Sequence, residues 1–153
     1  MKIIHGNRVG NLGKLAIGCS AIIFDATRPS ILLTGSRDNE CWCLLSGQME
    51  AGESVTEACL REVWGKTGFH GHVDRLHGIY SSPHRLCEYA DANRYKFVFL
   101  NFEVEPIAGS LTLSDETTEI GSFAQDQLTH MDIVEHHIER LVDAFAETRE
   151  VVF

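Results

Sequence analysis

Long apolar runs are absent from this sequence. No segment approaches the roughly 18 consecutive apolar residues that a membrane-spanning helix requires. The amino terminus carries one lysine, Lys2, but lacks the apolar core and the cleavage site of a secretory signal. These absences predict a soluble cytoplasmic protein with no membrane partner.

Paired cysteines are also absent. The five cysteines form an odd set without any C-x-x-C spacing, at Cys19, Cys41, Cys43, Cys59 and Cys87. Cysteine zinc sites need paired ligands at such short spacings, so the sequence offers no site of this kind. Cys41 and Cys43 flank Trp42, and a disulfide bond between such near neighbours on one face of a strand would be strained. We therefore interpret all five cysteines as reduced thiols with structural roles.

Positive charge is scarce. The chain has 13 lysine and arginine residues against 22 aspartate and glutamate residues, which gives a formal net charge of −9. The resulting field would repel a polyphosphate backbone unless a local basic patch overcame it. We therefore expect no nucleic acid polymer among the partners of this protein.

Internal repeats and low-complexity linkers are missing as well. The 153 residues, 44% of them hydrophobic, are enough to bury the core of one domain by themselves. We therefore expect a single domain over residues 1–153.

Clusters of apolar, aromatic and β-branched residues predict the strands. The expected strands cover residues 15–24, 31–33, 73–80, 95–104 and 119–123. Residues 25–29 are typical of a turn, so we expect the first two strands to form a hairpin.

Two segments have the pattern of helices. Ser54 and Glu57 form a capping box and Gly68 supplies a left-handed exit, so the first helix is predicted over residues 55–67. Its apolar residues at helical spacing are Cys59, Leu60, Val63 and Trp64. A second, amphipathic helix is predicted over residues 132–148, lying on the sheet. Its apolar residues are Val134, Ile138, Leu141, Val142 and Phe145.

Residues 47–69 carry glycine, charged and apolar residues at defined spacings. The set consists of Gly47, Glu53, Arg61, Glu62, Val63, Gly68 and Phe69. It resembles the Nudix box, G-x5-E-x7-R-E-U-x-E-E-x-G-U, in which U is a bulky apolar residue. The wider resemblance runs from about residue 14 to residue 148. It implies an α/β (α+β) fold, a Nudix-like α/β/α sandwich whose mixed central sheet lies between the two predicted helices.

A helix that carries carboxylates on one side suits a metal-assisted attack of water on a phosphate linkage. Water attacks a diphosphate linkage slowly until a divalent cation screens the negative charges and orients the oxygens. Mg²⁺ prefers oxygen ligands, and carboxylates at helix positions i, i+3 and i+4 project from one side. The resemblance therefore implies Mg²⁺ or Mn²⁺ as cofactor, with Gly47, Glu62 and Glu116 as candidate ligands. Glu119 is an alternative to Glu116 as the carboxylate from a later loop.

Two departures from the family pattern weaken this expectation. Positions i, i+3 and i+4 hold Glu62, Gly65 and Lys66, so two carboxylates are missing and a lysine stands where a metal ligand is usual. The preceding loop reads W-C-L-L-S-G over residues 42–47, without the proline and the first glycine of the family's W-x-L-P-G-G. We expect the affinity for Mg²⁺ to be much reduced.

The resemblance assigns catalytic roles to three charged residues. It implies that Arg61 orients the helix carboxylates, that Glu62 belongs to the site, and that Glu53 supports the site from the loop. The alternative for Glu62 is a surface ion pair with Lys66, four residues later. The alternative for Glu53 is a favourable interaction with the helix dipole at the amino end of the helix.

Arg37, Lys66 and Tyr89 are the candidate substrate-binding residues. The planar fork of Arg37 suits phosphate oxygens, although a solvated surface arginine is an equal alternative. Lys66 would meet a ligand phosphate directly. Tyr89 lies where similar enzymes place a loop that shapes the substrate pocket.

Three functional hypotheses are open at this point. The first is a Nudix-type hydrolase of a nucleoside diphosphate linked to another group, with weakened metal binding. The second is a catalytically impaired Nudix-fold module that binds a small nucleotide-like phosphate compound, with Lys66 replacing part of the charge of the metal. The third is a structural subunit of a homodimer, with the apolar tail 151–153 at the contact.

Overall fold

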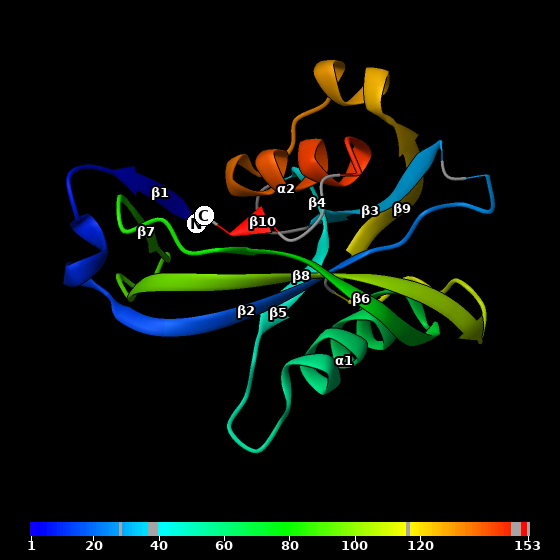
Figure 1. Ribbon diagram of the computed structural model, residues 1–153, viewed down its shortest axis with the longest axis horizontal. Coiled ribbons are helices and arrows are strands. Elements are labelled where there is room, and N and C mark those ends of the chain that lie inside the picture. The colour runs from blue at the N-terminus through cyan, green and yellow to red at the C-terminus, as the bar shows by residue number, and fades with distance from the viewer. Residues whose placement is uncertain (28, 37–39, 116, 148–150, 153) are drawn as a thin grey trace.

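A mixed seven-stranded sheet lies between two helices (Figure 1). The computed structural model describes residues 1–27, 29–36, 40–115, 117–147 and 151–152. At the centre of the sheet, β2 (Lys14–Ile22) runs parallel to β8 (Arg94–Ala108), and β8 pairs antiparallel with β6 (His70–Tyr80). The other strands of this sheet are β1 (Lys2–His5), β5 (Leu45–Gln48), β7 (Arg85–Glu88) and β10 (Val151–Val152).

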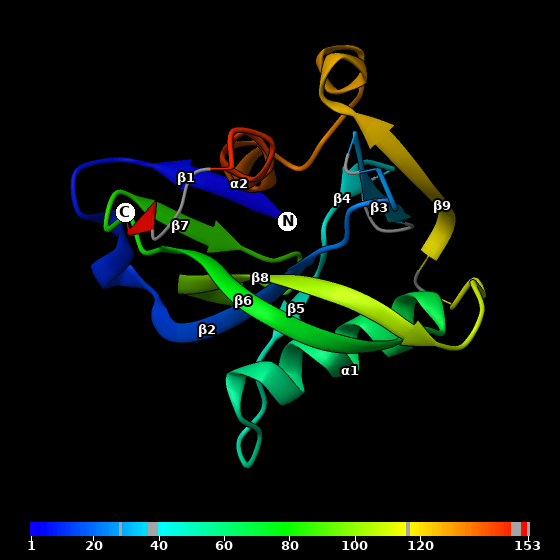
Figure 2. The ribbon, with the colours of Figure 1, turned by 45° about the vertical axis from the view of Figure 1, so that its right-hand side comes forward.

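The helices cover opposite faces of this sheet. The turned view in Figure 2 shows α1 (Val55–Thr67) below the sheet and α2 (Glu135–Phe145) above it. Two short 3-10 helices, η1 (Val9–Leu12) and η2 (Gln125–His130), precede β2 and α2 in the chain. The predicted α/β/α arrangement with a mixed sheet is therefore confirmed.

A second, three-stranded sheet corrects the expected hairpin. It consists of β4 (Trp42–Cys43), β3 (Ser30–Ser36) and β9 (Thr117–Ala124). The first two predicted strands pair only beside their turn, through a bridge between Phe24 and Ile31. Beyond it they separate, because β2 pairs with β5 and β8 whereas β3 pairs with β4 and β9.

Helix α1 has the predicted bounds because its signals are local. The Ser54 Oγ accepts a hydrogen bond from the Glu57 N–H at 3.2 Å, and the Glu57 carboxylate accepts one from the Ser54 N–H at 2.7 Å. Gly68 follows the helix with φ 77°. The buried face contains Cys59 and Val63, whereas Trp64, expected on that face, is 56% exposed.

Helix α2 differs from its prediction in extent and in orientation. It begins at Glu135 because the preceding residues are extended, with Ile133 bridged to Trp42. The expected end, Thr148, lies outside the described residues. The face turned to the protein carries His136, His137, Arg140, Leu141 and Ala144.

The predicted apolar residues of α2 are only partly buried. Leu141 is fully buried as expected, and Phe145 packs against the same core cluster. Ile138 and Val142 are 47% and 48% exposed, so their expected burial is wrong. Ile138 and Val142, four residues apart, lie next to the buried face of the helix. Packing of α2 against the sheet buries this neighbouring face, which carries polar side chains. Polar side chains thereby enter the interior next to the cleft described below.

The five cysteines are free thiols. Cys19 and Cys59 are buried in the core between the sheet and α1, and burial raises their pKa values to about 11 and about 12. Both are therefore protonated and unreactive at neutral pH, which agrees with a structural role. Among the described residues, no helix has the length and apolar character needed to cross a membrane.

Candidate active site

Arg61 joins the loop and the helix of the motif. Its Nε donates to Glu53 Oε1 at 2.5 Å, and its Nη2 donates to Glu53 Oε2 at 3.1 Å and to the Gln48 carbonyl at 3.0 Å. Its Nη1 donates to Glu62 Oε1 at 2.5 Å. One guanidinium thus holds two carboxylates and the loop backbone in fixed relative positions.

These contacts shift the pKa values of Glu53 and Arg61 in opposite directions. The hydrogen bonds from Arg61, and then the bond from the Glu50 N–H, hold the pKa of Glu53 below its usual value. The hydrogen bond to Glu53 in turn raises the pKa of Arg61. Arg61 and Glu53 are therefore fully charged at neutral pH.

Gly47 provides the surface on which the Glu62 carboxylate rests. A Cβ atom at Gly47 would overlap the carboxylate of Glu62. Gly47 belongs to β5 and pairs with Cys19 of the central strand β2, so it is held firmly. A glycine at this position therefore lets a helix carboxylate approach the backbone of β5.

Lys66 contacts the other side of the same carboxylate. Its Nζ lies 3.6 Å from Glu62 Oε2 and donates to the Ser46 carbonyl at 2.5 Å. The side chains of Lys66 and Glu62 are only 18% and 14% exposed. The contact is therefore more enclosed than the surface ion pair considered from the sequence.

The described residues do not form the Mg²⁺ site that the family pattern implies. They contain no group of three or more His, Cys, Asp or Glu side chains that could hold a metal ion. A Cβ at Gly65 would meet no atom within 4 Å, so that helix position is open. Glu116 lies outside the described residues, and Glu119 lines a different hollow, beside Trp42 and Phe123.

A cleft of about 530 Å³ opens beside this cluster. We call it the sheet–helix cleft, and its lining includes Ser46, Gly47, Gln48, Tyr89, Phe97, Phe99, His136 and His137. Strand β5, beside Lys66 and Glu62, forms one part of its wall, and aromatic rings form another. Of the predicted substrate-binding residues, Tyr89 lies in this wall, Lys66 touches the Ser46 carbonyl, and Arg37 lies outside the described residues.

The aromatic wall is a stack of rings. Phe97 and Phe99 stack with centroids 4.9 Å apart, and Phe99 and His136 stack at 5.1 Å. The alternation in Y-K-F-V-F places these rings on one face of β8, which was the signal available in the sequence. The role of His136 was not predicted from the sequence.

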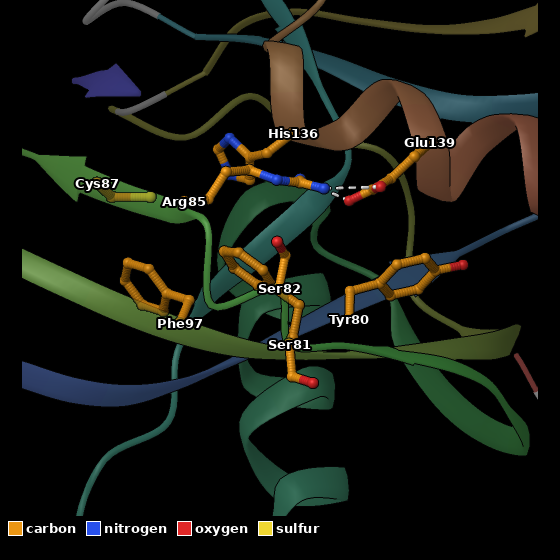
Figure 3. Close-up of a pocket in the computed structure, with 9 residues that line it drawn as sticks. Tyr80, Ser81, Ser82, Arg85, Cys87, Phe97, His136 and Glu139 are labelled. Atoms are coloured by element: carbon orange, nitrogen blue, oxygen red, sulfur yellow. Dashed lines mark hydrogen bonds and ion pairs between the residues drawn. The ribbon is translucent and has the colours of Figure 1, made fainter. Parts of the chain in front are cut away.

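A smaller, enclosed cavity adjoins the cleft. It measures about 30 Å³ and shares Phe97, Phe99 and His136 with the cleft lining. Figure 3 shows Arg85 paired with Glu139, and both residues line this cavity. Their two hydrogen bonds, at 2.6 and 2.9 Å, close the cavity on that side.

Buried polar groups lie beneath the cleft. Arg140 is fully buried, donates to the Ser20 Oγ at 2.8 Å and lies 4.3 Å above the Phe99 ring. Burial, together with the charge of Arg140, lowers the pKa of His136 to about 3 and holds that of His137 well below its usual value. Both rings are therefore neutral at pH 7, and His137 Nδ1 accepts a hydrogen bond from the Leu44 N–H at 2.9 Å.

Known proteins share this sequence pattern. The family model described as NUDIX domain matches residues 14–145. A MutT-like protein of Streptomyces ambofaciens is 31% identical over 107 residues, which are 70% of this chain and 62% of that protein. An ADP-ribose pyrophosphatase of Methanocaldococcus jannaschii is 34% identical over 101 residues, 64% of this chain and 56% of that protein. The matches thus span less than two thirds of the length of either relative.

Solved structures share the fold. A NUDIX hydrolase from Nitrosomonas europaea superposes with a TM-score of 0.73 at 16% identity, covering 92% of this chain and 79% of that chain. Such a low identity shows the fold alone. The family match, by contrast, extends over most of the chain and includes the motif from Gly47 to Phe69, so this chain belongs to the Nudix family.

Proposed function

We propose that this protein is a pyrophosphohydrolase that acts on a nucleoside diphosphate linked to another group. The observation that carries the proposal is the cluster of Arg61 with Glu53 and Glu62, placed against Gly47 at the wall of the sheet–helix cleft. Family membership supports this reaction class, and one relative is named an ADP-ribose pyrophosphatase.

The cleft offers complementary surfaces for such a ligand. Phosphate groups would lie at Ser46 and Gly47 of β5, next to the cations of the motif. The faces of Phe97 and Phe99 suit an aromatic base, because rings stack favourably on flat π systems. The neutral imidazoles of His136 and His137 add hydrogen-bonding groups without adding charge.

The proposed reaction is attack of water on one phosphorus atom. The water oxygen bonds to phosphorus as the bridging P–O bond breaks, and a proton of the water passes to a carboxylate. Nudix hydrolases generally use divalent metals such as Mg²⁺, but the described residues do not provide a ligand set that fits such an ion. We therefore expect turnover to be slow.

A second candidate is a binding module without turnover. Gly65 and Lys66 replace two carboxylates, and Lys66 is in contact with both Ser46 and Glu62. A cation at this position would hold a ligand phosphate but would not activate water. Nucleotide binding without hydrolysis is therefore the outcome that distinguishes this candidate.

Turnover of a substrate panel tests the two candidates. We would measure phosphate and nucleotide release from nucleoside diphosphate derivatives with Mg²⁺ or Mn²⁺, for the wild type, Glu62→Gln and the control Glu105→Gln. Glu105 is exposed on β8, so its substitution changes the net charge equally without touching the motif. If the protein is a hydrolase, we expect measurable turnover in the wild type. Glu62→Gln should reduce this turnover by roughly a hundredfold or more, as for loss of a group that acts in the transition state.

Two results would count against the hydrolase. One is turnover that survives Glu62→Gln at the level of the Glu105→Gln control, because the motif then takes no part. The other is the absence of turnover on every substrate together with measurable nucleotide binding, which would leave the binding module.

A further inference from the structure

The ammonium group of Lys66 lies among the kinds of oxygen that a divalent cation prefers. It donates to the Ser46 carbonyl at 2.5 Å and lies 3.6 Å from a carboxylate oxygen of Glu62. Carboxylate and carbonyl oxygens are the protein ligands of hard cations. The ammonium thus contacts two oxygens of the kinds that a metal would use, and one of them belongs to the candidate ligand Glu62.

We infer that Lys66 serves as a built-in cation of this site, which excludes a divalent metal ion and presents its own positive charge to a ligand phosphate. The part that concerns the ligand rests on the proposed function. The part that concerns the metal stands on the contacts of Lys66 alone.

The charges of the cluster support this inference. Two cations, Arg61 and Lys66, face two carboxylates, Glu53 and Glu62, so the cluster is neutral without a metal. Arg61 uses both oxygens of Glu53 and one of Glu62, and Lys66 lies beside the other. A divalent ion would have to separate these pairs and would meet two positive charges at close range.

The position of Lys66 is also suited to a phosphate. An ammonium group has three donors, and Ser46 and Glu62 engage two directions at most. The charge of Lys66 contributes to lowering the pKa of His137, a residue of the cleft wall. The ammonium therefore acts electrostatically on the cleft, and it would attract a phosphate bound beside Ser46 and Gly47 of β5.

Variants with matched carboxylates isolate the effect of the ammonium on metal binding. Gly65→Glu adds one carboxylate while Lys66 stays, and the position has room because a Cβ there meets no atom within 4 Å. The double variant Gly65→Glu with Lys66→Gln has the same carboxylates without the ammonium. A third protein, Gly65→Glu with Lys14→Gln, removes a positive charge from an exposed residue of β2 as the control. Glutamate also favours the helix over glycine, so folding is expected.

Mn²⁺ binding is then measured by calorimetry and by electron paramagnetic resonance without any nucleotide. We expect no specific Mn²⁺ site in the wild type. We expect the variant that lacks Lys66 to bind Mn²⁺ roughly tenfold or more tightly than Gly65→Glu and than the Lys14 control, since one repelling charge is removed at close range. Equal Mn²⁺ affinities in the three variants, or stoichiometric Mn²⁺ binding by the wild type, would overturn the inference.

ADP binding in the presence of a chelator tests the part of the inference that concerns the ligand phosphate. We expect wild-type protein to bind ADP without divalent metal and Lys66→Gln to bind it roughly tenfold more weakly, as for loss of a charge-assisted hydrogen bond. ADP binding that requires Mn²⁺, or that is unchanged in Lys66→Gln, overturns this part. Absence of ADP binding under all conditions would count against the proposed ligand, whereas the Mn²⁺ comparison would still decide the exclusion of the metal.

Discussion

Arg61 shows how a single residue organises the motif. Its guanidinium binds the Glu53 carboxylate, the Gln48 carbonyl and the Glu62 carboxylate together. A lysine has one point charge and no planar fork, so it could not maintain this geometry. The spacing of eight residues between Glu53 and Arg61 therefore reflects a direct contact between the loop and the first turns of α1.

The variant Gly47→Ala tests the packing between β5 and α1. The added Cβ would overlap the Glu62 carboxylate and push it away from its cations. We expect a loss of about 1 to 3 kcal/mol in the free energy of unfolding, as for other small-to-large changes in packed sites. Urea unfolding measures this loss, and activity or nucleotide binding should decrease with it.

Gly65→Ala is the matched control for this prediction. The Cβ at Gly65 meets no atom within 4 Å, and alanine favours a helix over glycine by about 0.5 to 1 kcal/mol. We therefore expect this variant to be slightly more stable than the wild type. A Gly47→Ala protein with unchanged stability would mean that Glu62 does not rest on Gly47.

At the scale of the element, α1 and α2 differ in what determines them. The bounds of α1 follow from Ser54, Glu57 and Gly68, which act on the backbone within one turn. The face that α2 buries depends on the sheet against which it packs. Periodicity identified the helix but pointed to Ile138 and Val142 as buried, and the sheet selected the adjacent polar stripe.

Because α2 buries two histidines, we expect the free energy of unfolding to decrease in acid. In the folded protein, burial lowers the pKa of His136 to about 3 and that of His137 well below 6.5. Above pH 6.5 both states carry neutral rings, whereas below it the unfolded chain gains protons that the folded protein does not. The free energy of unfolding should therefore fall as the pH falls from about 6.5 towards 3, by at most about 1.4 kcal/mol per pH unit for each histidine.

Unfolding by urea at a series of pH values measures this slope. His136→Gln and His137→Gln should each flatten it, even where they lower the stability overall. His130→Gln is the control, because His130 is exposed at the end of η2. A slope that is unaffected in both α2 variants would contradict the burial of neutral imidazoles.

At the scale of the whole molecule, charge is distributed unevenly. The chain carries a net charge of −9, yet the charges of Arg61 and Lys66 balance those of Glu53 and Glu62. Arg140 places a buried positive charge beneath Phe99 of the cleft. A small phosphate ligand meets this local environment, whereas a long polyanion meets the acidic surface.

This distribution predicts that DNA and RNA do not bind. We expect no retardation of single-stranded or double-stranded nucleic acid in gel mobility measurements at low salt, where electrostatic attraction is strongest. ADP binding in the same buffer serves as the positive control. Retardation that disappears as salt is added would show a basic surface that the net charge conceals.

The fold constrains how the tail, residues 151–153, could take part in a homodimer contact. The described residues of the tail, Val151 and Val152, pair parallel with Gly78 and Ile79 of β6 in the same chain. Their backbone is therefore engaged in the central sheet, although a homodimer stays a prediction.

Some properties of this protein were determined by the sequence alone. The capping residues and spacing of Gly47, Glu53, Arg61 and Glu62 predicted α1 and the family, because these signals are local along the chain. Only the tertiary structure decided that β2 and β3 enter different sheets, that α2 buries its histidines, and that Lys66 reaches the Ser46 carbonyl. These features depend on contacts between segments distant in the chain, and side-chain packing rather than local propensity selects among the arrangements that the sequence permits.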